Sequence, residues 1–274
     1  MSRVALITGA SSGIGESAAE ELIKAGFVVY AAARRTERMI HLQESGAKII
    51  SLDLTVDESI RSCVDTIYNN EGRIDVLVNN AGYGSYGAVE DVCVDEARRQ
   101  FEVNLFGLAR ITQLILPTMR RQNGGRIINV ASMGGKFHAP YGAWYHSTKF
   151  ALEGWSDCLR LEVEKPFGIK VVIIEPGAIN TSWEGIAMEN LKNVSRGGAY
   201  ETSAASVADA MGRLYSAKNT SPASLIGRTI CKASTAKIPK TRYLVGAYAK
   251  LLVFARKMLS DRCYDALARK IMKM

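Results

Sequence analysis

The sequence has little that would suit a metal site, a disulfide scaffold or a secreted precursor. Its five cysteines lie far apart without a CxxC pair, so neither a zinc site nor a disulfide framework is expected. His41 and His138 have no partners at the spacing of metal ligands. No charged leader precedes a long apolar run, and we expect no signal peptide. These absences favour a reducing compartment, and we expect a cytoplasmic protein.

Charge is unevenly distributed along the chain. Residues 1–217 hold 22 Lys/Arg and 25 Asp/Glu, a net charge of −3, whereas residues 218–274 hold 13 and 2, a net charge of +11. A nucleic-acid enzyme more often carries its basic patch around the working site, and aromatic residues are rarely interleaved here. We therefore discount nucleic-acid binding and expect a basic tail with a role of its own.

Short apolar runs alternate with longer amphipathic segments. The runs are rich in Val and Ile without in–out alternation, which is typical of parallel strands covered on both faces. Strands are expected at Val4–Ile7, Phe27–Ala33, Ala47–Leu52, Val76–Asn79, Arg126–Ala131, Val171–Glu175 and, more weakly, Ser224–Cys231. Helices are expected at Gly13–Ala25, Thr36–Ser45, Val56–Glu71, Asp95–Gln122, Trp144–Glu164 and Ser203–Ala217. The pattern predicts an α/β protein: a single-domain Rossmann fold whose doubly wound, seven-stranded parallel sheet has helices on both faces.

Two regions interrupt this alternation. Thr181–Thr202 contains three glycines and little periodicity, and we expect a long mobile segment there. Tyr243–Leu259 is apolar but contains basic residues, and it has the periodicity of an amphipathic helix. We therefore expect a dinucleotide-binding and catalytic domain over residues 1–235, a substrate flap at about 181–202, and a basic amphipathic helical extension over residues 236–274.

A glycine-rich loop follows the first expected strand. It reads Thr8-Gly9-Ala10-Ser11-Ser12-Gly13-Ile14-Gly15, and a helical pattern begins at once. Glycines in this context let the backbone turn tightly and let a diphosphate approach the N-terminus of a helix, where free N–H groups stabilise an anion. The alternative is an ordinary glycine-rich turn, which the strand before and the helix after disfavour.

Tyr145 and Lys149 form a second chemical signal. They lie four residues apart on an expected helix and therefore share a face. An ammonium beside a phenol favours the phenolate, so we expect Lys149 to lower the pKa of Tyr145 toward the working pH of an acid–base catalyst. His146 is adjacent but points about 100° away, and we assign it to packing or to the surface.

The order of these motifs resembles the short-chain dehydrogenase/reductase family over roughly residues 3–232. Within that family the chain looks most like oxidoreductases related to the 17β-hydroxysteroid and retinol dehydrogenases. The resemblance is carried by the glycine loop, Asn79-Asn80-Ala81-Gly82, Asn104, Ser132, Tyr145 with Lys149, and Pro176-Gly177 with Thr181.

This resemblance implies a catalytic group and a cofactor site. Tyr145 would exchange a proton with the substrate oxygen, Ser132 would hydrogen-bond that oxygen, Lys149 would tune Tyr145 and contact the nicotinamide ribose, and Asn104 would help hold a water relay. The cofactor would supply or accept the hydride. The implied cofactor-binding residues are Gly9, Ser11, Ser12, Gly13, Ile14, Gly15, Arg34, Arg35, Asp53, Leu54, Asn80, Ala81, Gly82, Tyr145, Lys149, Pro176, Gly177, Ile179 and Thr181.

The second expected strand indicates which nicotinamide cofactor is preferred. It ends at Ala33 without the acidic residue that would hydrogen-bond a ribose 2′-hydroxyl, and Arg34 and Arg35 follow. Guanidinium groups bind a 2′-phosphate through forked, charge-assisted hydrogen bonds, so NADP(H) is expected. The alternative is that both arginines only solvate the start of the next helix.

The expected substrate is a fairly hydrophobic ketone or its secondary alcohol. Apolar contacts are expected from Trp183, Ile186, Met188 and Leu191 of the flap, with Tyr83, Tyr86, Met133, Phe137 and Trp144 as further wall. The chain is thus expected to transfer a hydride between NADP(H) and a carbonyl. A catalytically inactive NADP-binding regulator or scaffold of the same fold is the alternative, and a nucleotide-sugar epimerase or dehydratase fits the glycine spacing less well.

The basic tail leaves three interpretations open. Its apolar stripe could cover the substrate cleft, pack on a neighbouring subunit of a homo-oligomer, or lie peripherally on an anionic membrane with its basic residues outward. It is too short and too charged to span a bilayer.

Overall fold

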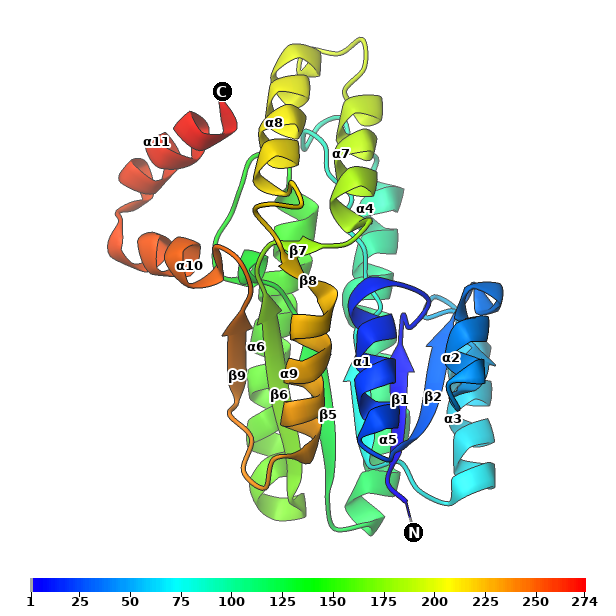
Figure 1. The fold of residues 1–274 in the computed structure, drawn as a ribbon. Coiled ribbons are helices and arrows are strands. Elements are labelled where there is room, and N and C mark those ends of the chain that lie inside the picture. Colours follow the sequence, from blue (N-terminus) through cyan, green and yellow to red (C-terminus); the bar gives the residue numbers. More distant parts are fainter. Residues whose placement is uncertain (1) are drawn as a thin grey trace.

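A seven-stranded parallel sheet runs through the centre of the computed structural model, which describes residues 2–274 (Figure 1). Its strands are β1 (Val4–Thr8), β2 (Val28–Ala33), β3 (Lys48–Ser51), β4 (Val76–Asn79), β5 (Gly125–Val130), β6 (Ile169–Pro176) and β9 (Arg242–Val245). They lie in the order β3-β2-β1-β4-β5-β6-β9, and every neighbouring pair is parallel. The chain builds outward from β1 to β3 and then crosses to β4 on the other side. This reversal creates a crevice at the carboxyl ends of β1 and β4.

Helices cover both faces of the sheet, as predicted. The larger elements are α1 (Gly13–Lys24), α2 (Ile40–Glu44), α3 (Asp57–Glu71), α4 (Val94–Phe101), α5 (Gly107–Arg121), α6 (Ala143–Phe167) and α9 (Ala223–Thr235), with short turns η1 (Thr36–Met39), η2 (Glu102–Phe106) and η3 (Met133–Gly135). Ala5 and Ile7 of β1 pack in one core with α1, α2 and α9, while Val4 and Leu6 pack in another with α3, α5 and α6. Because both faces of β1 are buried, its sequence is continuously apolar.

The seventh strand is not where the sequence predicted it. Ser224–Cys231 lies within α9, because Ile226, Ile230 and Ala233 recur at helical spacing and turn one face toward the sheet. The last strand is instead β9, which pairs with β6, so the predicted helix over Tyr243–Leu259 is wrong in its first part. The division at residue 235 stays a prediction, and this pairing argues for ending the Rossmann domain after Val245.

The segment expected to be irregular after β6 is largely helical. After the two-residue strand β7 (Ile179–Asn180), α7 (Trp183–Val194) packs against α8 (Glu201–Leu214), and β8 (Ser221–Pro222) pairs with β7. Ala187 and Leu191 of α7 meet Ala204 and Val207 of α8 in a small core of their own. Figure 1 shows the two helices standing beyond the carboxyl edge of the sheet.

The end of the chain forms two further helices, α10 (Ala249–Met258), which contacts η3, and α11 (Asp261–Met272), which lies beside α8 (Figure 1). Leu252 of α10 and Tyr264 of α11 pack against Met133 and Phe137, in the segment that follows β5. The Tyr264 hydroxyl donates to the His138 carbonyl oxygen at 3.0 Å. Among residues 2–274, no helix has both the length and the apolar character needed to cross a bilayer.

Packing between α1 and α9 allows a test of the fold. A Cβ on Gly227 would lie 2.4 Å from Ser17 Oγ and 2.7 Å from the Ser17 carbonyl oxygen, whereas a Cβ on Gly154 of α6 would meet nothing within 4 Å. We expect Gly227→Ala to lower the free energy of unfolding by about 1–3 kcal/mol, because α9 must move away from backbone. Gly154→Ala is the matched control and should raise it by about 0.5–1 kcal/mol. Urea unfolding of both variants measures this, and equal effects would contradict the packing described.

Candidate active site

A cavity of about 530 Å³ opens at the carboxyl edge of the sheet, where the strand order reverses. Its walls come from the ends of β1, β2, β4, β5 and β6 and from the segments that follow them. The predicted cofactor residues that line it are Gly9, Ser11, Ser12, Gly13, Ile14, Arg34, Arg35, Asp53, Leu54, Asn80, Ala81, Gly82, Tyr145, Lys149, Pro176, Gly177, Ile179 and Thr181. The structure thus gathers residues that are distant in sequence into one cavity; their roles stay predictions.

The glycine loop is shaped to receive an anion. Gly9 and Gly13 have φ values of +68° and +62°, which side chains rarely adopt. A Cβ on Gly15 would lie 2.4 Å from both the Gly9 carbonyl oxygen and Asn80 Nδ2. Gly15 therefore stands behind the loop and allows close packing, while the loop leads into the N-terminus of α1.

Asn80 and Thr8 tie the glycine loop to the end of β4. Asn80 Nδ2 donates to the carbonyl oxygens of Thr8 and Gly9 at 3.0 and 3.2 Å, and the backbone N–H groups of Asn80 and Ala81 both donate to Thr8 Oγ1 at 3.1 Å. The two strand ends on either side of the switch point, and the glycine loop with them, are thereby held in a fixed arrangement.

Positive charge gathers at the end of the cavity near β2 and β3. Arg34 and Arg35 are exposed and line this end of the cavity. Arg99 of α4 also lines it, and it was not predicted because no sequence motif marks it. Burial raises the pKa of Asp53, but hydrogen bonds from Thr55 and the charges of Arg34 and Arg99 outweigh it, so the pKa is lowered overall. The residues present fit a nicotinamide dinucleotide: a diphosphate cradle lies between this basic end and Tyr145.

Ser132, Tyr145 and Lys149 meet at the other end of the cavity. Ser132 follows β5 and caps η3, its Oγ accepting a hydrogen bond from the Gly134 N–H at 3.0 Å. Tyr145 and Lys149 lie one turn apart on α6, with Lys149 Nζ 6.0 Å from the centre of the Tyr145 ring. Lys149 Nζ donates to the Val130 carbonyl oxygen at 3.0 Å, which anchors it to the end of β5.

The two ionisable groups do not titrate as the sequence suggested. Burial raises the pKa of Tyr145 to about 12, against the opposing effect of a hydrogen bond with Ser132. Burial also lowers the pKa of Lys149 to about 8, partly offset by the negative charge of Glu153. The expected lowering of the Tyr145 pKa is therefore wrong for this state of the protein, because desolvation outweighs the hydrogen bond with Ser132.

Aromatic rings cause much of that desolvation. The rings of Trp183 and Tyr86 lie 5.0 and 5.7 Å from the Tyr145 ring, centre to centre. His146 is buried behind Tyr145; its Nδ1 lies 2.7 Å from the Gly134 carbonyl oxygen, and burial lowers its pKa to about 4. Of the two predicted positions, packing in the interior or exposure at the surface, the structure shows the first.

Asn104 lies behind the cavity wall, in the π-helical turn η2 between α4 and α5. Its Oδ1 accepts from the Tyr83 N–H at 3.0 Å, and its Nδ2 donates to the Tyr83 carbonyl oxygen at 2.9 Å and to Thr148 Oγ1 at 3.1 Å. Asn104 thus clamps the loop after β4 to the helix that carries Tyr145. Its expected part in a water relay stays a prediction.

The side of the cavity beside Tyr145 is aromatic and apolar. Trp183 and Ile186 line it as expected, and Tyr215 lines it although no motif pointed to it. Tyr83 also lines the cavity, but its hydroxyl donates to Glu96 near the basic end. The other expected wall residues lie elsewhere. Met188 and Leu191 face α8, Met133 and Phe137 pack against the tail, and Tyr86 and Trp144 are absent from the lining.

A cluster of possible metal-ligating side chains lies at the surface, formed by residues of α1 and α2. Single oxygen atoms of Glu16 and Glu20 on α1 and a ring nitrogen of His41 on α2 lie within 4.8 Å of one another. His41 Nε2 is 2.8 Å from Glu16 Oε1, within hydrogen-bonding distance. It lies apart from the residues that line the cavity.

The comparisons with known proteins agree with one another. The sequence pattern described as short chain dehydrogenase matches residues 3–191. A probable short-chain type dehydrogenase/reductase of Helicobacter pylori is 35% identical over 270 residues, covering 98% of this chain and 97% of its own length. A 3-ketodihydrosphingosine reductase of Bacteroides thetaiotaomicron is 36% identical over 252 residues, covering 91% and 90%. The crystal structure of a short-chain dehydrogenase from Streptomyces avermitilis matches with a TM-score of 0.76 at 30% identity, over 100% of this chain and 96% of that one.

Proposed function

The chain belongs to the short-chain dehydrogenase/reductase family, and from that premise we propose that it is an NADPH-dependent reductase of a fairly hydrophobic ketone. As a member of the family it is an oxidoreductase that uses a nicotinamide dinucleotide. The proposal adds the cofactor, the substrate class and the residues that do the chemistry. The observation that carries it is the convergence of Ser132, Tyr145 and Lys149 at one end of the cavity.

The ionisation of the site suits reduction. With its pKa near 12, Tyr145 holds its proton at neutral pH and can donate it to a carbonyl oxygen. Ser132 hydrogen-bonds the same oxygen and orients the carbonyl. Lys149, charged below about pH 8, places a positive charge beside the developing alkoxide.

A nicotinamide dinucleotide held by the glycine loop would supply the hydride for the new C–H bond at the carbonyl carbon. The C=O π-electrons pass to oxygen, and the phenol of Tyr145 protonates it to give a secondary alcohol. One ketone and one proton are consumed for each dinucleotide oxidised. The rings that bury Tyr145 exclude bulk water from this step.

The substrate class follows from the wall beside Tyr145. Trp183, Ile186 and Tyr215 offer apolar and aromatic contacts to the group next to the carbonyl. The similar protein from B. thetaiotaomicron is named for reducing a ketone, 3-ketodihydrosphingosine. Both points support a ketone with a substantial apolar part.

A catalytically inactive, cofactor-binding regulator is the alternative function. Such a protein would not require Ser132, Tyr145, Lys149 and Asn104 together. All four are present, and three of them share the cavity wall. We therefore favour the enzyme.

The preference for NADP(H) rests on the charge around the end of β2. Ala33 leaves that strand end without a carboxylate, and the guanidinium groups of Arg34 and Arg35 line the adjacent cavity. Arg99 adds a third positive charge from α4. A 2′-phosphate would be bound by forked hydrogen bonds that a 2′-hydroxyl cannot make.

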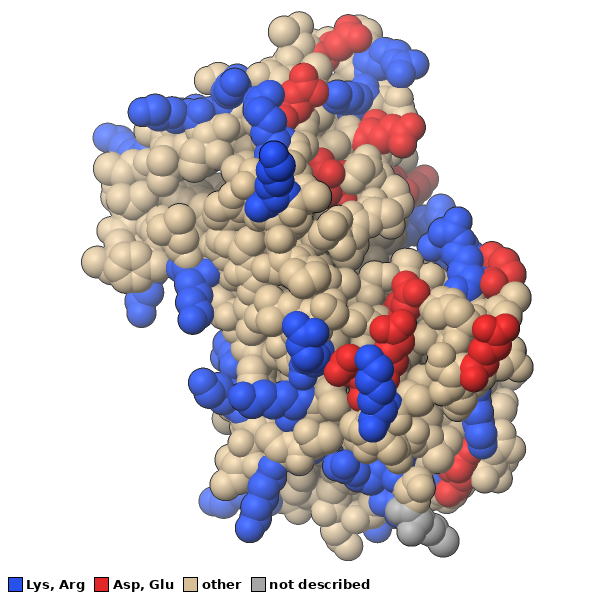
Figure 2. Space-filling view, viewed as in Figure 1, with Lys and Arg blue, Asp and Glu red and all other residues tan. Residues whose placement is uncertain are grey.

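The exposed side of α10 supports peripheral contact with an anionic bilayer, for a protein that we still expect in the cytoplasm. Leu251, Phe254 and Met258 are 64, 62 and 65% exposed and follow one another along one side of the helix. Lys250 and Lys257 adjoin them. Each lysine near an anionic surface contributes about 1 kcal/mol of attraction, and Figure 2 shows further Lys and Arg side chains over this region.

A bilayer fits this face better than a second copy of the chain does. With 10 residues α10 is about 15 Å long, and its exposed side is far smaller than the ~800 Å² per partner of a stable dimer. No tail residue is among those that line the cavity, so a cover over the cleft lacks support within residues 2–274. The remaining side of α10 packs on the body through Leu252 and Val253.

Tyr145→Phe tests the proposed chemistry. We expect reduction of the best ketone to fall by roughly 10²–10⁴-fold, because the proton donor is lost, while the Kd for NADPH stays unchanged. The measurement is NADPH absorbance over a panel of steroids, retinoids, aryl ketones and long-chain ketones, with fluorescence titration for binding. Tyr68→Phe, at the surface of α3, is the control. A variant that turns over like the wild type, or a wild type that reduces nothing while binding NADPH, would contradict the proposal.

Replacing both Arg34 and Arg35 by Ala tests the cofactor preference. We expect the ratio of kcat/KM for NADPH over NADH to fall roughly ten- to a hundredfold, since one hydrogen bond to a charged group contributes about 1.5–3 kcal/mol. Arg38→Ala, one turn further on and outside the cavity, should leave the ratio unchanged. A wild type that prefers NADH would refute the assignment.

Substitution on α10 tests the membrane contact without removing β9. We expect the wild type to sediment with phosphatidylglycerol vesicles more than with phosphatidylcholine vesicles, and salt to weaken the binding. The triple change of Leu251, Phe254 and Met258 to Ser should abolish sedimentation, whereas Ile238→Ser, 84% exposed elsewhere, should not. Equal binding by wild type and triple variant, or loss of a dimer in the variant, would overturn this contact.

A further inference from the structure

A line of ionisable side chains runs along α6 away from the cavity. Tyr145, Lys149 and Glu153 are spaced four residues apart, so each lies one turn beyond the last. Tyr145 and Lys149 line the cavity, and Glu153 lies behind them. All three are at least 90% buried. A carboxylate in this position acts on Lys149 through a medium with little water to screen it.

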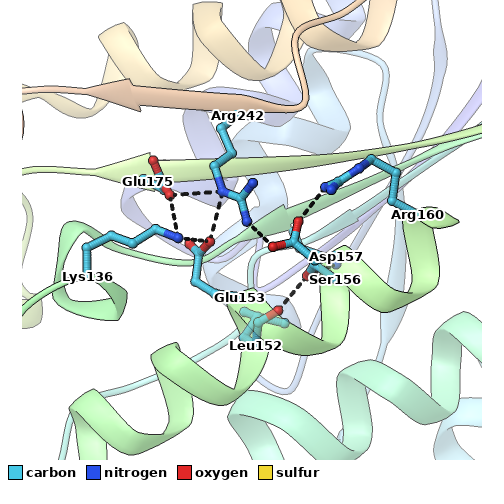
Figure 3. A network of polar contacts seen from close by, with 9 residues as sticks. Lys136, Leu152, Glu153, Ser156, Asp157, Arg160, Glu175 and Arg242 are labelled. Atoms are coloured by element: carbon cyan, nitrogen blue, oxygen red, sulfur yellow. Dashed lines mark hydrogen bonds and ion pairs between the residues drawn. The ribbon is translucent and has the colours of Figure 1, made fainter.

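Glu153 belongs to a network of ionisable side chains from α6, β6, β9 and the end of η3 (Figure 3). Lys136, from the end of η3, lies 2.7 Å from Glu153 Oε2, and Arg242 Nε of β9 lies 3.2 Å from the same oxygen. Glu175 of β6 lies 3.4 Å from both Lys136 Nζ and Arg242 Nε. Arg242 also pairs with Asp157, which in turn pairs with Arg160.

The loop after Ser132 fits closely over this part of α6. A Cβ on Gly135 would lie 3.0 Å from both Glu153 Cγ and the Lys149 carbonyl oxygen. The backbone that carries Ser132 and Lys136 therefore packs directly between Lys149 and Glu153. The close packing of η3 on α6 thus holds Ser132 in a fixed arrangement with Lys149 and Glu153.

Glu153 and Glu175 also face each other. Among the residues that the structure describes, buried Glu153 Oε1 has no hydrogen-bond donor, and buried Glu175 Oε1 has only the two 3.4 Å ion-pair contacts with Lys136 and Arg242. Buried polar atoms normally have partners. A proton on Glu175 would supply the missing donor to Glu153, so Glu153 is satisfied when the pair holds one proton.

We propose that Glu153, braced by Glu175, Lys136 and Arg242, is a positioning residue that keeps Lys149 in its charged form. This inference rests on the proposed function only where it is measured by turnover. Glu153 touches neither substrate nor cofactor in this arrangement. It acts through Lys149, one turn nearer the cavity.

The sign of the effect follows from the charges. Burial lowers the pKa of Lys149 to about 8, and the negative charge of Glu153 opposes that shift. Burial and the neighbouring Glu153 raise the pKa of Glu175 to about 7, while Lys136 and Arg242 act in the opposite direction. The charge of Glu153 thus favours the protonated form of a buried lysine that would otherwise lose its proton more readily.

Glu153→Gln is the decisive variant, because it removes the charge and preserves the shape. We expect the pKa of Lys149 to fall by about one unit, the lower end of the effect of a nearby charge. NMR titration of the protein labelled with ¹³C-lysine, with Lys149→Met to assign the signal, reads this directly. The readout needs no turnover, so it stands even if no ketone is reduced.

Turnover provides the second readout. If the charged lysine is needed, kcat/KM falls above the pKa of Lys149, and this limb should move about one unit lower in Glu153→Gln. The loss would be about tenfold above pH 8.5 and absent at pH 6. A purely structural role would lower kcat/KM equally at all pH values.

Asp157→Asn is the matched control, since Asp157 lies about 12 Å along the helix from Lys149 but shares the partner Arg242. It should reduce stability and leave the Lys149 titration at its wild-type value. An unchanged Lys149 titration in a folded Glu153→Gln protein would overturn the proposal. Equal shifts in both variants would also overturn it.

Glu175→Gln tests the bracing pair independently. A folded pKa above the ordinary glutamate value means that the stabilisation from this proton is complete at low pH and is lost as the pH rises through 7. The wild type should therefore lose Tm between pH 5 and pH 8 relative to Glu175→Gln. Parallel Tm profiles would remove Glu175 from the proposal.

Discussion

The removal of Tyr145 and Lys149 from water is the constraint on which the site depends. Both side chains are buried at the carboxyl edge of the sheet. Burial shifts the pKa of each group in the direction that favours its neutral form. A protonated phenol and a lysine that titrates near pH 8 are the consequences. Any surrounding group that changes the hydration or the charge of this pair therefore acts on the chemistry.

Several other elements of the fold contact this pair or the residues next to it. α7 brings Trp183 against the Tyr145 ring, and Asn104 fastens α6 to the loop after β4. β9 brings Arg242 to the carboxyl pair behind Lys149. The tail that follows β9 then packs on the segment after Ser132 through Phe137. The C-terminal extension is therefore in direct contact with the segment that follows Ser132.

Much of the fold was predictable because local pattern and tertiary environment agree. β1 is apolar throughout and is covered on both faces, and the glycine loop needs a strand before it and a helix after it. The prediction of secondary structure was wrong where an apolar segment is compatible with either a strand or a helix. Ser224–Cys231 is as apolar as a strand, yet Ile226 and Ile230 bury one helical face. Similarly, the first residues of Tyr243–Leu259 pair with β6 in competition with helix formation.

The sequence by itself determined the family motifs, the order of the first six strands of the sheet, and most of the predicted cofactor residues that line the cavity, because each of these depends on residue type and spacing. Only the tertiary structure decided their surroundings. It buried Tyr145 and so reversed the expected direction of its pKa shift. It also placed Arg99 and Tyr215 in the cavity lining, and it paired Glu175 with Arg242 behind Lys149. Burial and contacts between distant residues arise from packing, which no spacing along the chain specifies.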